Sequence, residues 1–273
     1  MAHIIMFETS NTHNTCRVGN VNLNLHRAGQ GAPILFLHGA GGISEWTSFF
    51  KNLSQTHDVW APDHPGFGLS DDPSFINNMS DLVIFYLDFL DTHAPKGGFH
   101  LVGHSMGGWL AAEIAAQNAQ HVNSLTLISS AGLQLEGVPM GDIFIWSAEE
   151  SVKKLIFDPI IQEKRLNYQP TPEEAEIIAK NKFTFAKLAR QPRLFNPELK
   201  NRLNRIKVPA QIIWGEHDGL IPKEYAKLWS KALNTDTCTV LSQCSHSPAN
   251  EKPLETAHLI KVFIAKLNNE FTN

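Results

Sequence analysis

A serine flanked by glycines lies where an apolar run meets a helical pattern, in the stretch LVGHSMGGWLAAEIAAQ (residues 101–117). Gly103, Ser105 and Gly107 have the spacing G-x-S-x-G. A serine held on a sharp turn between a buried strand and a helix can attack a carbonyl carbon, and the glycines permit the close packing that such a turn needs. The pattern is also typical of an ordinary turn between a strand and a helix, so the prediction of chemistry depends on partner residues elsewhere.

A serine hydroxyl is a poor nucleophile near neutral pH and needs a base. Among the 13 histidines of the chain, His246 stands out because it lies in LSQCSHSPANEKP, between the last predicted strand and the last predicted helix. His104 is adjacent to Ser105 in sequence and therefore points away from it, and His217 precedes a better candidate for the acid. We predict that His246 is the base.

The base in turn needs a carboxylate to orient it. Asp218 follows the apolar run AQIIWGEH directly, which makes it our candidate. Asp63 is the rival acid, but its setting APDHPGFGLSD predicts a turn in which the carboxylate caps backbone N–H groups.

Two backbone N–H groups are predicted to bind an oxyanion. Met106 begins the helix after the serine, where N–H groups lack partners within the helix. The stretch FLHGAGG (residues 36–42) ends an early strand with glycines, and Ala40 is the second candidate donor, with Gly41 as the alternative. A loop that only makes a tight turn, and binds no oxyanion, would need the same glycine-containing backbone.

The elements that must position these residues alternate between strands and helices. Short apolar runs that end in Gly, Pro, Asp, Ser or His are typical of strands buried on both faces of a parallel sheet. Helical patterns lie between them, so the predicted class is α/β, with ligands bound at the carboxyl ends of the strands. The expected strands are VNLNLHRAG at a sheet edge, PILFLHG, HDVWAPD, FHLVGHS, SLTLISS, AQIIWGEHD and TCTVL, and the expected helices are 45–53, 80–90, 106–117, 222–233 and 253–267.

Residues 132–205 break this alternation, because they contain helical signals and no strand. Ser147 with Glu150 and Thr171 with Glu174 have capping-box spacing, and Asn196-Pro197 is predicted to open a third helix. The segment is far longer than a crossover helix of about a dozen residues. We predict a core domain of residues 1–131 and 206–273, and a helical cap (lid) of residues 132–205 over the strand ends.

Composition limits the partners. The 273 residues carry a net charge of −4 and 42% hydrophobic residues, so a globular protein with a small-molecule ligand is expected, with no nucleic acid and no membrane as partner. Three cysteines without CxxC spacing, and no apolar segment of leader or membrane-spanning type, favour a cytoplasmic protein. The sequence does not indicate an oligomeric state.

With these residues placed, the chain resembles the α/β-hydrolase-fold enzymes along nearly its whole length. HGAGG resembles the oxyanion loop of that family, DHPGFGLSD its D-x-P-G-x-G-x-S segment, GHSMGG its nucleophile elbow, WGEHDGLIP its acid loop and CSHSPANEKP its histidine loop. The resemblance implies an eight-stranded, mostly parallel sheet with a cap after strand six, and the order Ser105, Asp218, His246 is the order of the family.

The resemblance also implies a reaction. Ser105 stands where haloalkane dehalogenases and epoxide hydrolases have aspartate, which favours acyl transfer from an ester, thioester or lactone to water without metal or organic cofactor. GHSMGG is shared with meta-cleavage-product hydrolases, which split a carbon–carbon bond; they usually carry Trp after the histidine and an arginine in the cap, whereas Ser247 and Pro248 follow His246 here. A third interpretation is a ligand-binding, receptor-like module with little turnover.

The charge of the cap bears on the substrate. Residues 147–207 contain 13 lysines and arginines against 8 aspartates and glutamates, a net charge of +5. A cation directed inward would favour a substrate with a carboxylate, but solvated helix faces account for the same composition.

Overall fold

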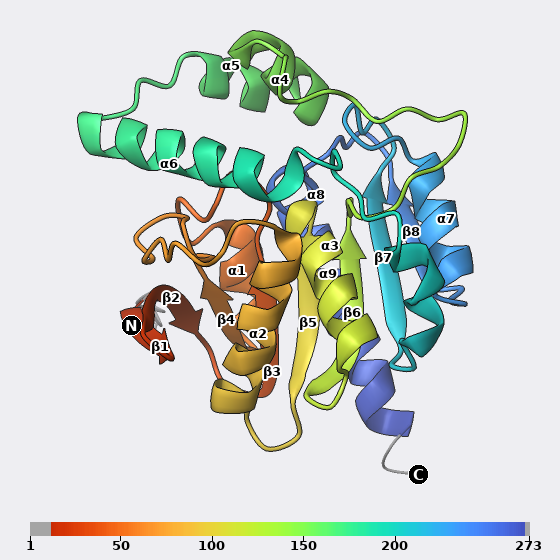
Figure 1. Ribbon diagram of the computed structural model, residues 1–273. Helices are drawn as coiled ribbons and strands as arrows, with labels where there is room; N and C mark the ends of the chain where they lie inside the picture. The colour runs from red at the N-terminus through yellow and green to blue at the C-terminus, as the bar shows by residue number, and fades with distance from the viewer. Residues whose placement is uncertain (1–11, 271–273) are drawn as a thin grey trace, which may run out of the picture.

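The computed structural model describes residues 12–270, in which one eight-stranded sheet carries helices on both faces (Figure 1). The strand order is β1-β2-β4-β3-β5-β6-β7-β8, and every pair from β4 to β8 is parallel. The predicted α/β class with a mostly parallel sheet of eight strands is thus confirmed. The strands are β1 (Thr12–Val18), β2 (Val21–Ala28), β3 (Ala32–Leu37), β4 (His57–Pro62), β5 (Phe99–His104), β6 (Val122–Ile128), β7 (Ala210–Gly215) and β8 (Cys238–Leu241).

The edge of the sheet differs from the prediction. β2 was expected at the edge, but β1 pairs with it in antiparallel register and takes that position. The sequence THNTCRV of β1 gives a weak strand signal because it is mostly polar, and among residues 14–18 only Cys16 and Val18 are buried.

The helices of the core flank the sheet and match four of the five predictions closely. The predicted helix at 45–53 begins only at Ser48, because Thr47 has an extended backbone. The core helices are α1 (Ser48–Leu53), α2 (Met79–His93), α3 (Met106–Gln117), α7 (Glu224–Ala232), α8 (Pro248–Glu251) and α9 (Pro253–Glu270).

Two hydrophobic clusters lie on the two faces of the sheet. Because successive side chains of a strand point to opposite faces, Leu101 of β5 joins one cluster and Val102 joins the other. Both are fully buried. The central strands that end at the predicted site are therefore held rigidly from both sides.

We call residues 132–205 the cap segment; residues 148–189 lie over the carboxyl ends of the strands, and the chain then descends beside the sheet, where Arg205 reaches the end of α3 (Figure 1). Thr171 and Glu174 make both hydrogen bonds of a capping box, and the Ser147 side chain accepts from the N–H of Glu150. The division of the chain into a core and a cap remains a prediction. The cap elements are α4 (Ala148–Leu155), α5 (Pro159–Leu166), α6 (Pro172–Ala189) and the 3-10 turns η1 (Leu199–Asn201) and η2 (Leu203–Arg205).

Two features of the cap segment differ from the prediction. Asn196-Pro197 opens only the short turns η1 and η2 and no α-helix, with the Asn196 side chain accepting from the N–H of Glu198. α5 was not predicted, although Asp158 caps its N-terminus and Pro159 begins it.

Across residues 12–270, none of the helices combines the length and the apolar character that a bilayer crossing requires. The N-terminal stretch MAHIIMFETS, to which our expectation about a leader applies, lies outside the described residues.

Candidate active site

Ser105 lies on a strained turn between β5 and α3. Its backbone has φ 55° and ψ −117°, a conformation that is costly for a residue with a side chain and that occurs mainly at functional sites. A Cβ on Gly103 would lie 2.3 Å from the carbonyl oxygen of Gly107, and a Cβ on Gly107 would lie 2.0 Å from that of Leu37. Glycine at both positions therefore lets α3 pack directly against β5 and β3.

The structure brings Ser105, His246 and Asp218, which we call the triad residues, into one hydrogen-bonded row. Nε2 of His246 lies 2.9 Å from Oγ of Ser105, and Nδ1 of His246 lies 2.8 Å from Oδ2 of Asp218. All three residues are buried. Asp63, the rival acid, is not part of this row: it accepts from Asn24 and from the N–H of Leu69, as expected for a carboxylate that holds a turn.

The hydrogen bonds of Asp218 determine which ring nitrogen of His246 carries the proton. Its Oδ1 accepts from the N–H groups of Leu220 and Ile221, at 3.0 and 2.8 Å. An ionised carboxylate only accepts, so Nδ1 of His246 donates to Oδ2 and Nε2 is left free to accept from the hydroxyl of Ser105. This is the tautomer that can remove a proton from the serine.

His104 supports the histidine loop and does not face the serine. Its Nε2 donates to the carbonyl oxygen of His246 at 2.8 Å. Burial, followed by the nearby His246, lowers the pKa of His104 from 6.5 to about 4. His104 is therefore a neutral donor at neutral pH.

The oxyanion loop after β3 is held through the carbonyl oxygen of Gly39. That oxygen accepts from Nδ1 of His38 at 2.7 Å and from the N–H of Gly42 at 3.1 Å. Because the Gly39–Ala40 peptide is trans, the N–H of Ala40 points the opposite way from this fixed carbonyl. The loop is adjacent to the nucleophile, since a Cβ on Gly39 would lie 3.2 Å from Cβ of Ser105.

The candidate oxyanion donors remain available. Met106 is the first residue of α3, so its N–H has no partner within the helix. Among the loop and turn hydrogen bonds of residues 12–270, none has the N–H of Ala40 or Met106 as its donor. The N–H of the alternative, Gly41, is likewise no donor among these bonds, and its carbonyl oxygen accepts from the side chain of Asn181 in the cap.

Behind the oxyanion loop lies a buried chain of three side chains that the sequence analysis did not single out. The N–H of His64 donates to Nε2 of His38, Nε2 of His64 donates to the carbonyl oxygen of His38, and the hydroxyl of Tyr86 lies 2.5 Å from Nδ1 of His64. Desolvation by burial lowers the pKa of both histidines and raises that of Tyr86. The available signal was that His38 directly follows one strand and His64 lies two residues after the next.

Helix α6 of the cap segment binds two loops of the core, the oxyanion loop and residues 66–70. The side chain of Asn181 donates to the carbonyl oxygen of Gly41 and accepts from the N–H of Gly68, and Thr184 donates to the carbonyl oxygen of Gly66. Lys180 also donates to residues 66–70, to the carbonyl oxygens of Gly68 and Ser70. In the described part of the chain, no hydrogen bond or ion pair joins the side chain of a lysine or arginine of the cap to the triad residues.

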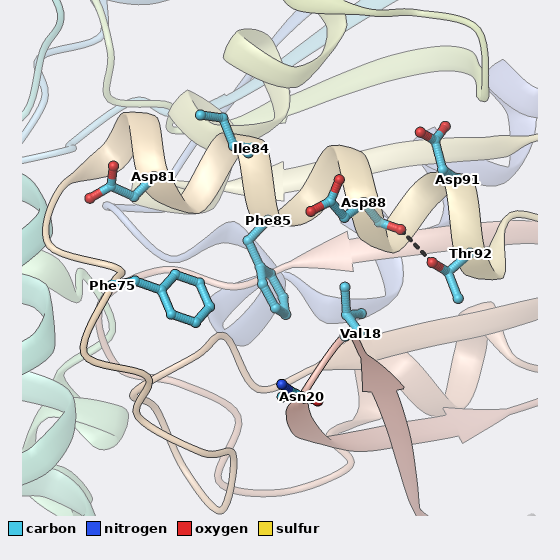
Figure 2. Close-up of a pocket in the computed structure, with 10 residues that line it drawn as sticks. Val18, Asn20, Phe75, Asp81, Ile84, Phe85, Asp88, Asp91 and Thr92 are labelled. Carbon is cyan, nitrogen blue, oxygen red and sulfur yellow. Dashed lines mark hydrogen bonds between the residues drawn. The ribbon is translucent and has the colours of Figure 1, made fainter.

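A separate groove of about 660 Å³ lies between α2 and the turn from β1 to β2, and none of the triad residues lines it. Figure 2 shows Phe75, Ile84 and Phe85 beside several aspartates there. Asp81 accepts from the N–H of Asn77, and Asp91 pairs with His121. Across residues 12–270, no cluster of three or more His, Cys, Asp or Glu could hold a metal ion.

With this geometry in place, comparison with known proteins identifies the class of protein. Residues 32–146 match the family model of the alpha/beta hydrolase fold. A monoacylglycerol lipase of Mus musculus is 30% identical, over 89% of this chain and 78% of its own. A 2-hydroxy-6-oxononadienedioate/2-hydroxy-6-oxononatrienedioate hydrolase of Paraburkholderia phymatum is also 30% identical, over 84% and 86% of the two chains. The chain belongs to the alpha/beta hydrolase family, and it is a hydrolase of the lipase/esterase or meta-cleavage-product type.

Solved structures agree on the fold. A putative lipase from Acinetobacter baumannii superimposes with a TM-score of 0.77 at 22% identity, covering 95% of this chain and 92% of its own. A meta-cleavage product hydrolase from Pseudomonas fluorescens superimposes with a TM-score of 0.74 at 21% identity, covering 93% and 97%. At these identities the likeness concerns the fold alone.

Proposed function

We propose that the protein is a serine hydrolase that cleaves the carboxylic ester, thioester or lactone bond of a small molecule. The observation that carries this proposal is the row from Ser105 to Asp218, in which both nitrogens of His246 are within 2.9 Å of their partners. The relative named monoacylglycerol lipase supports an ester as the substrate class.

The proposed reaction begins when His246 removes the proton of Ser105 as the hydroxyl oxygen attacks the carbonyl carbon. The N–H groups of Ala40 and Met106 bind the oxyanion that forms, and Asp218 stabilises the imidazolium. The imidazolium then protonates the leaving group, which leaves an acyl group on Ser105. Water activated by His246 releases the acid and restores the serine.

The proposal is tested by the release of p-nitrophenol from p-nitrophenyl acetate and butyrate. We expect activity in the wild type, and loss of activity in the Ser105→Ala variant. The matched control is Ser74→Ala, because Ser74 is an exposed serine of the core. The absence of activity in the wild type, as expected of a ligand-binding module, or equal activity in Ser105→Ala, contradicts the proposal.

Carbon–carbon bond hydrolysis is the second candidate, favoured by the relatives that are named as hydrolases of hydroxy-oxo-dienoates. The same triad residues would serve it, and the cap would have to supply a cation for the substrate carboxylate. The two functions are separated by comparing kcat/KM for p-nitrophenyl butyrate with kcat/KM for 2-hydroxy-6-oxo-6-phenylhexa-2,4-dienoate. Hydrolysis of the dienoate is measured as the loss of its absorbance. We expect the ester to be the better substrate.

The cytoplasm remains our proposal for the compartment. It is supported by the free thiols of Cys16, Cys238 and Cys244, because secreted proteins more often pair their cysteines. Fractionation of the source cells with an antibody against the protein tests this proposal, and recovery from the medium or a membrane pellet contradicts it.

A further inference from the structure

The α4–α5 hairpin of the cap is bound to the two loops that carry the acid and the base. The carbonyl oxygen of Lys154 accepts from the N–H of Gly219 at 3.2 Å and from the hydroxyl of Ser245 at 2.8 Å. The carbonyl oxygen of Leu155 accepts from the N–H of His246 at 3.2 Å. The last turn of α4 therefore touches the residue after Asp218 and the backbone of His246 itself.

These hydrogen bonds hold the hairpin at the point where its partly buried Leu155 packs against the hydrophobic core. α4 and α5 contain no buried residue. The ring of Phe157, between the two helices, stacks on the ring of His217 with centroids 4.5 Å apart. The position of the hairpin is thus set largely where it meets the acid and histidine loops.

Glu251, in α8, connects both sides of this junction through one carboxylate. Its Oε1 accepts from the N–H of Ser245 at 2.8 Å, directly before His246. Its Oε2 accepts from the N–H groups of Phe157 and Asp158, at 2.6 and 3.2 Å, directly before α5. Hydrogen bonds from backbone N–H groups to an ionised acceptor are about twice as strong as neutral ones.

We propose that Glu251 is a positioning residue that couples the seating of the α4–α5 hairpin to the placement of His246. Three N–H donors from two segments converge on two oxygens that can only accept. A glutamine at this position has one accepting oxygen and cannot hold both segments. Because the hairpin and the histidine loop also bind each other, through the carbonyl oxygen of Leu155 and the N–H of His246, release of one segment should loosen the other. An aspartate keeps the charge but is one methylene shorter, so it cannot span the same gap. This inference rests on the proposed role of His246 as the base.

The first test measures kcat and KM for p-nitrophenyl acetate in the wild type, Glu251→Gln and Glu251→Asp. We expect kcat to fall about 10- to 100-fold in both variants, because a displacement of about 1 Å at a catalytic group costs up to about 100-fold. KM should stay within about twofold, because the small ester gains little binding from the cap. Glu255→Gln is the matched control, since Glu255 is an exposed carboxylate near the start of α9.

The second test follows hydrogen exchange of single amides and does not depend on activity. In Glu251→Gln and Glu251→Asp, the amides of Ser245, Phe157 and Asp158, which donate to the carboxylate, should exchange about tenfold faster or more, which corresponds to loss of a hydrogen bond to a charged acceptor. The amide of His246, which donates to the carbonyl oxygen of Leu155, should exchange faster together with them. The amides of β5 should be unchanged. A merely local role of Glu251 would affect only one of the two segments.

The outcomes separate this inference from the proposed function. Wild-type kcat in both Glu251 variants, or faster exchange in one segment without the other, overturns the coupling while the triad stands. A wild type that hydrolyses no ester overturns the proposed function, and the exchange data alone then decide whether Glu251 couples the hairpin to the histidine loop. Reduced kcat together with faster exchange in both segments is the result that we expect.

Discussion

Asp218 contacts His246 with only one of its two oxygens: Oδ2 lies 2.8 Å from Nδ1 of His246, while Oδ1 is held by the N–H groups of Leu220 and Ile221. In an Asp218→Asn variant, the amide oxygen must therefore take the place of Oδ1, and the NH₂ group must face His246. Nδ1 then has to accept, and the proton moves to Nε2. We expect kcat for ester hydrolysis to fall about 10⁴-fold, because this tautomer cannot remove the proton of Ser105.

Thermal unfolding of Asp218→Asn serves as the control for folding, because the two backbone hydrogen bonds to the side-chain oxygen are retained. A kcat within tenfold of the wild type, in a variant that melts normally, would mean that Asp218 does not set the tautomer of His246.

The hydrogen bond from Nδ1 of His38 to the carbonyl oxygen of Gly39, in the oxyanion loop, gives a second prediction. His38→Phe keeps a ring in the buried site but removes the donor that fixes the carbonyl oxygen of Gly39. Loss of an oxyanion donor costs about 100- to 1000-fold in kcat, and a displaced donor should cost part of that, about 10- to 100-fold. KM should change little. Steady-state kinetics with p-nitrophenyl acetate measure both, and an unchanged kcat would show that Gly42 alone holds the loop.

The close contact between α3 and β3 gives a third prediction. The Cβ of Gly107→Ala would lie 2.0 Å from the carbonyl oxygen of Leu37 and 2.5 Å from that of His38. Because both are backbone atoms, the strand or the helix must shift, and the free energy of unfolding should fall by about 1–3 kcal/mol. Gly41→Ala is the control, since its Cβ would meet nothing within 4 Å. Urea denaturation of the two variants checks the difference, and equal midpoints would refute it.

The buried histidines predict a dependence of stability on pH. Burial lowers the pKa of His100 and of His104 from 6.5 to about 4, and lowers that of His38 and His64 as well. As the pH falls below 6.5, the unfolded chain binds protons that the folded protein does not. The free energy of unfolding should therefore be highest above pH 6.5 and should decrease towards pH 4.

Urea denaturation between pH 7 and pH 4 measures this slope. His100→Asn should make the slope smaller, by at most about 1.4 kcal/mol per pH unit, because one group that titrates in the unfolded chain is lost. A variant at the exposed His258, His258→Gln, is the control. A stability that rises on acidification would contradict the assignment of these histidines as neutral.

Much of the site could be predicted because Ser105, Asp218 and Ala40 each follow a buried apolar strand closely. The carboxyl ends of parallel strands share one edge of the sheet, so chain order and strand endings bring these residues together. His246 was placed by the same argument, as the loop residue after the last strand. These positions depend on hydrophobic patterns, which the sequence displays.

The rest depends on contacts that leave no pattern. Glu251 binds backbone N–H groups, and every residue except proline supplies one, so its partners in the α4–α5 hairpin have no signature in the sequence. The histidine pair His38 and His64 is a tertiary contact between two loops. β1 was missed because a polar edge strand shows little alternation, and α5 because a short helix without buried residues shows no apolar face.

The central claim is that Ser105 carries the acyl group, and covalent labelling tests it most directly. The protein is treated with a fluorophosphonate, digested, and analysed by mass spectrometry, beside the Ser105→Ala and His246→Ala variants. We expect one added phosphonyl group on the wild type, located on Ser105, none on Ser105→Ala, and strongly slowed labelling of His246→Ala. Labelling at another residue, or ester hydrolysis that persists in Ser105→Ala, would contradict it.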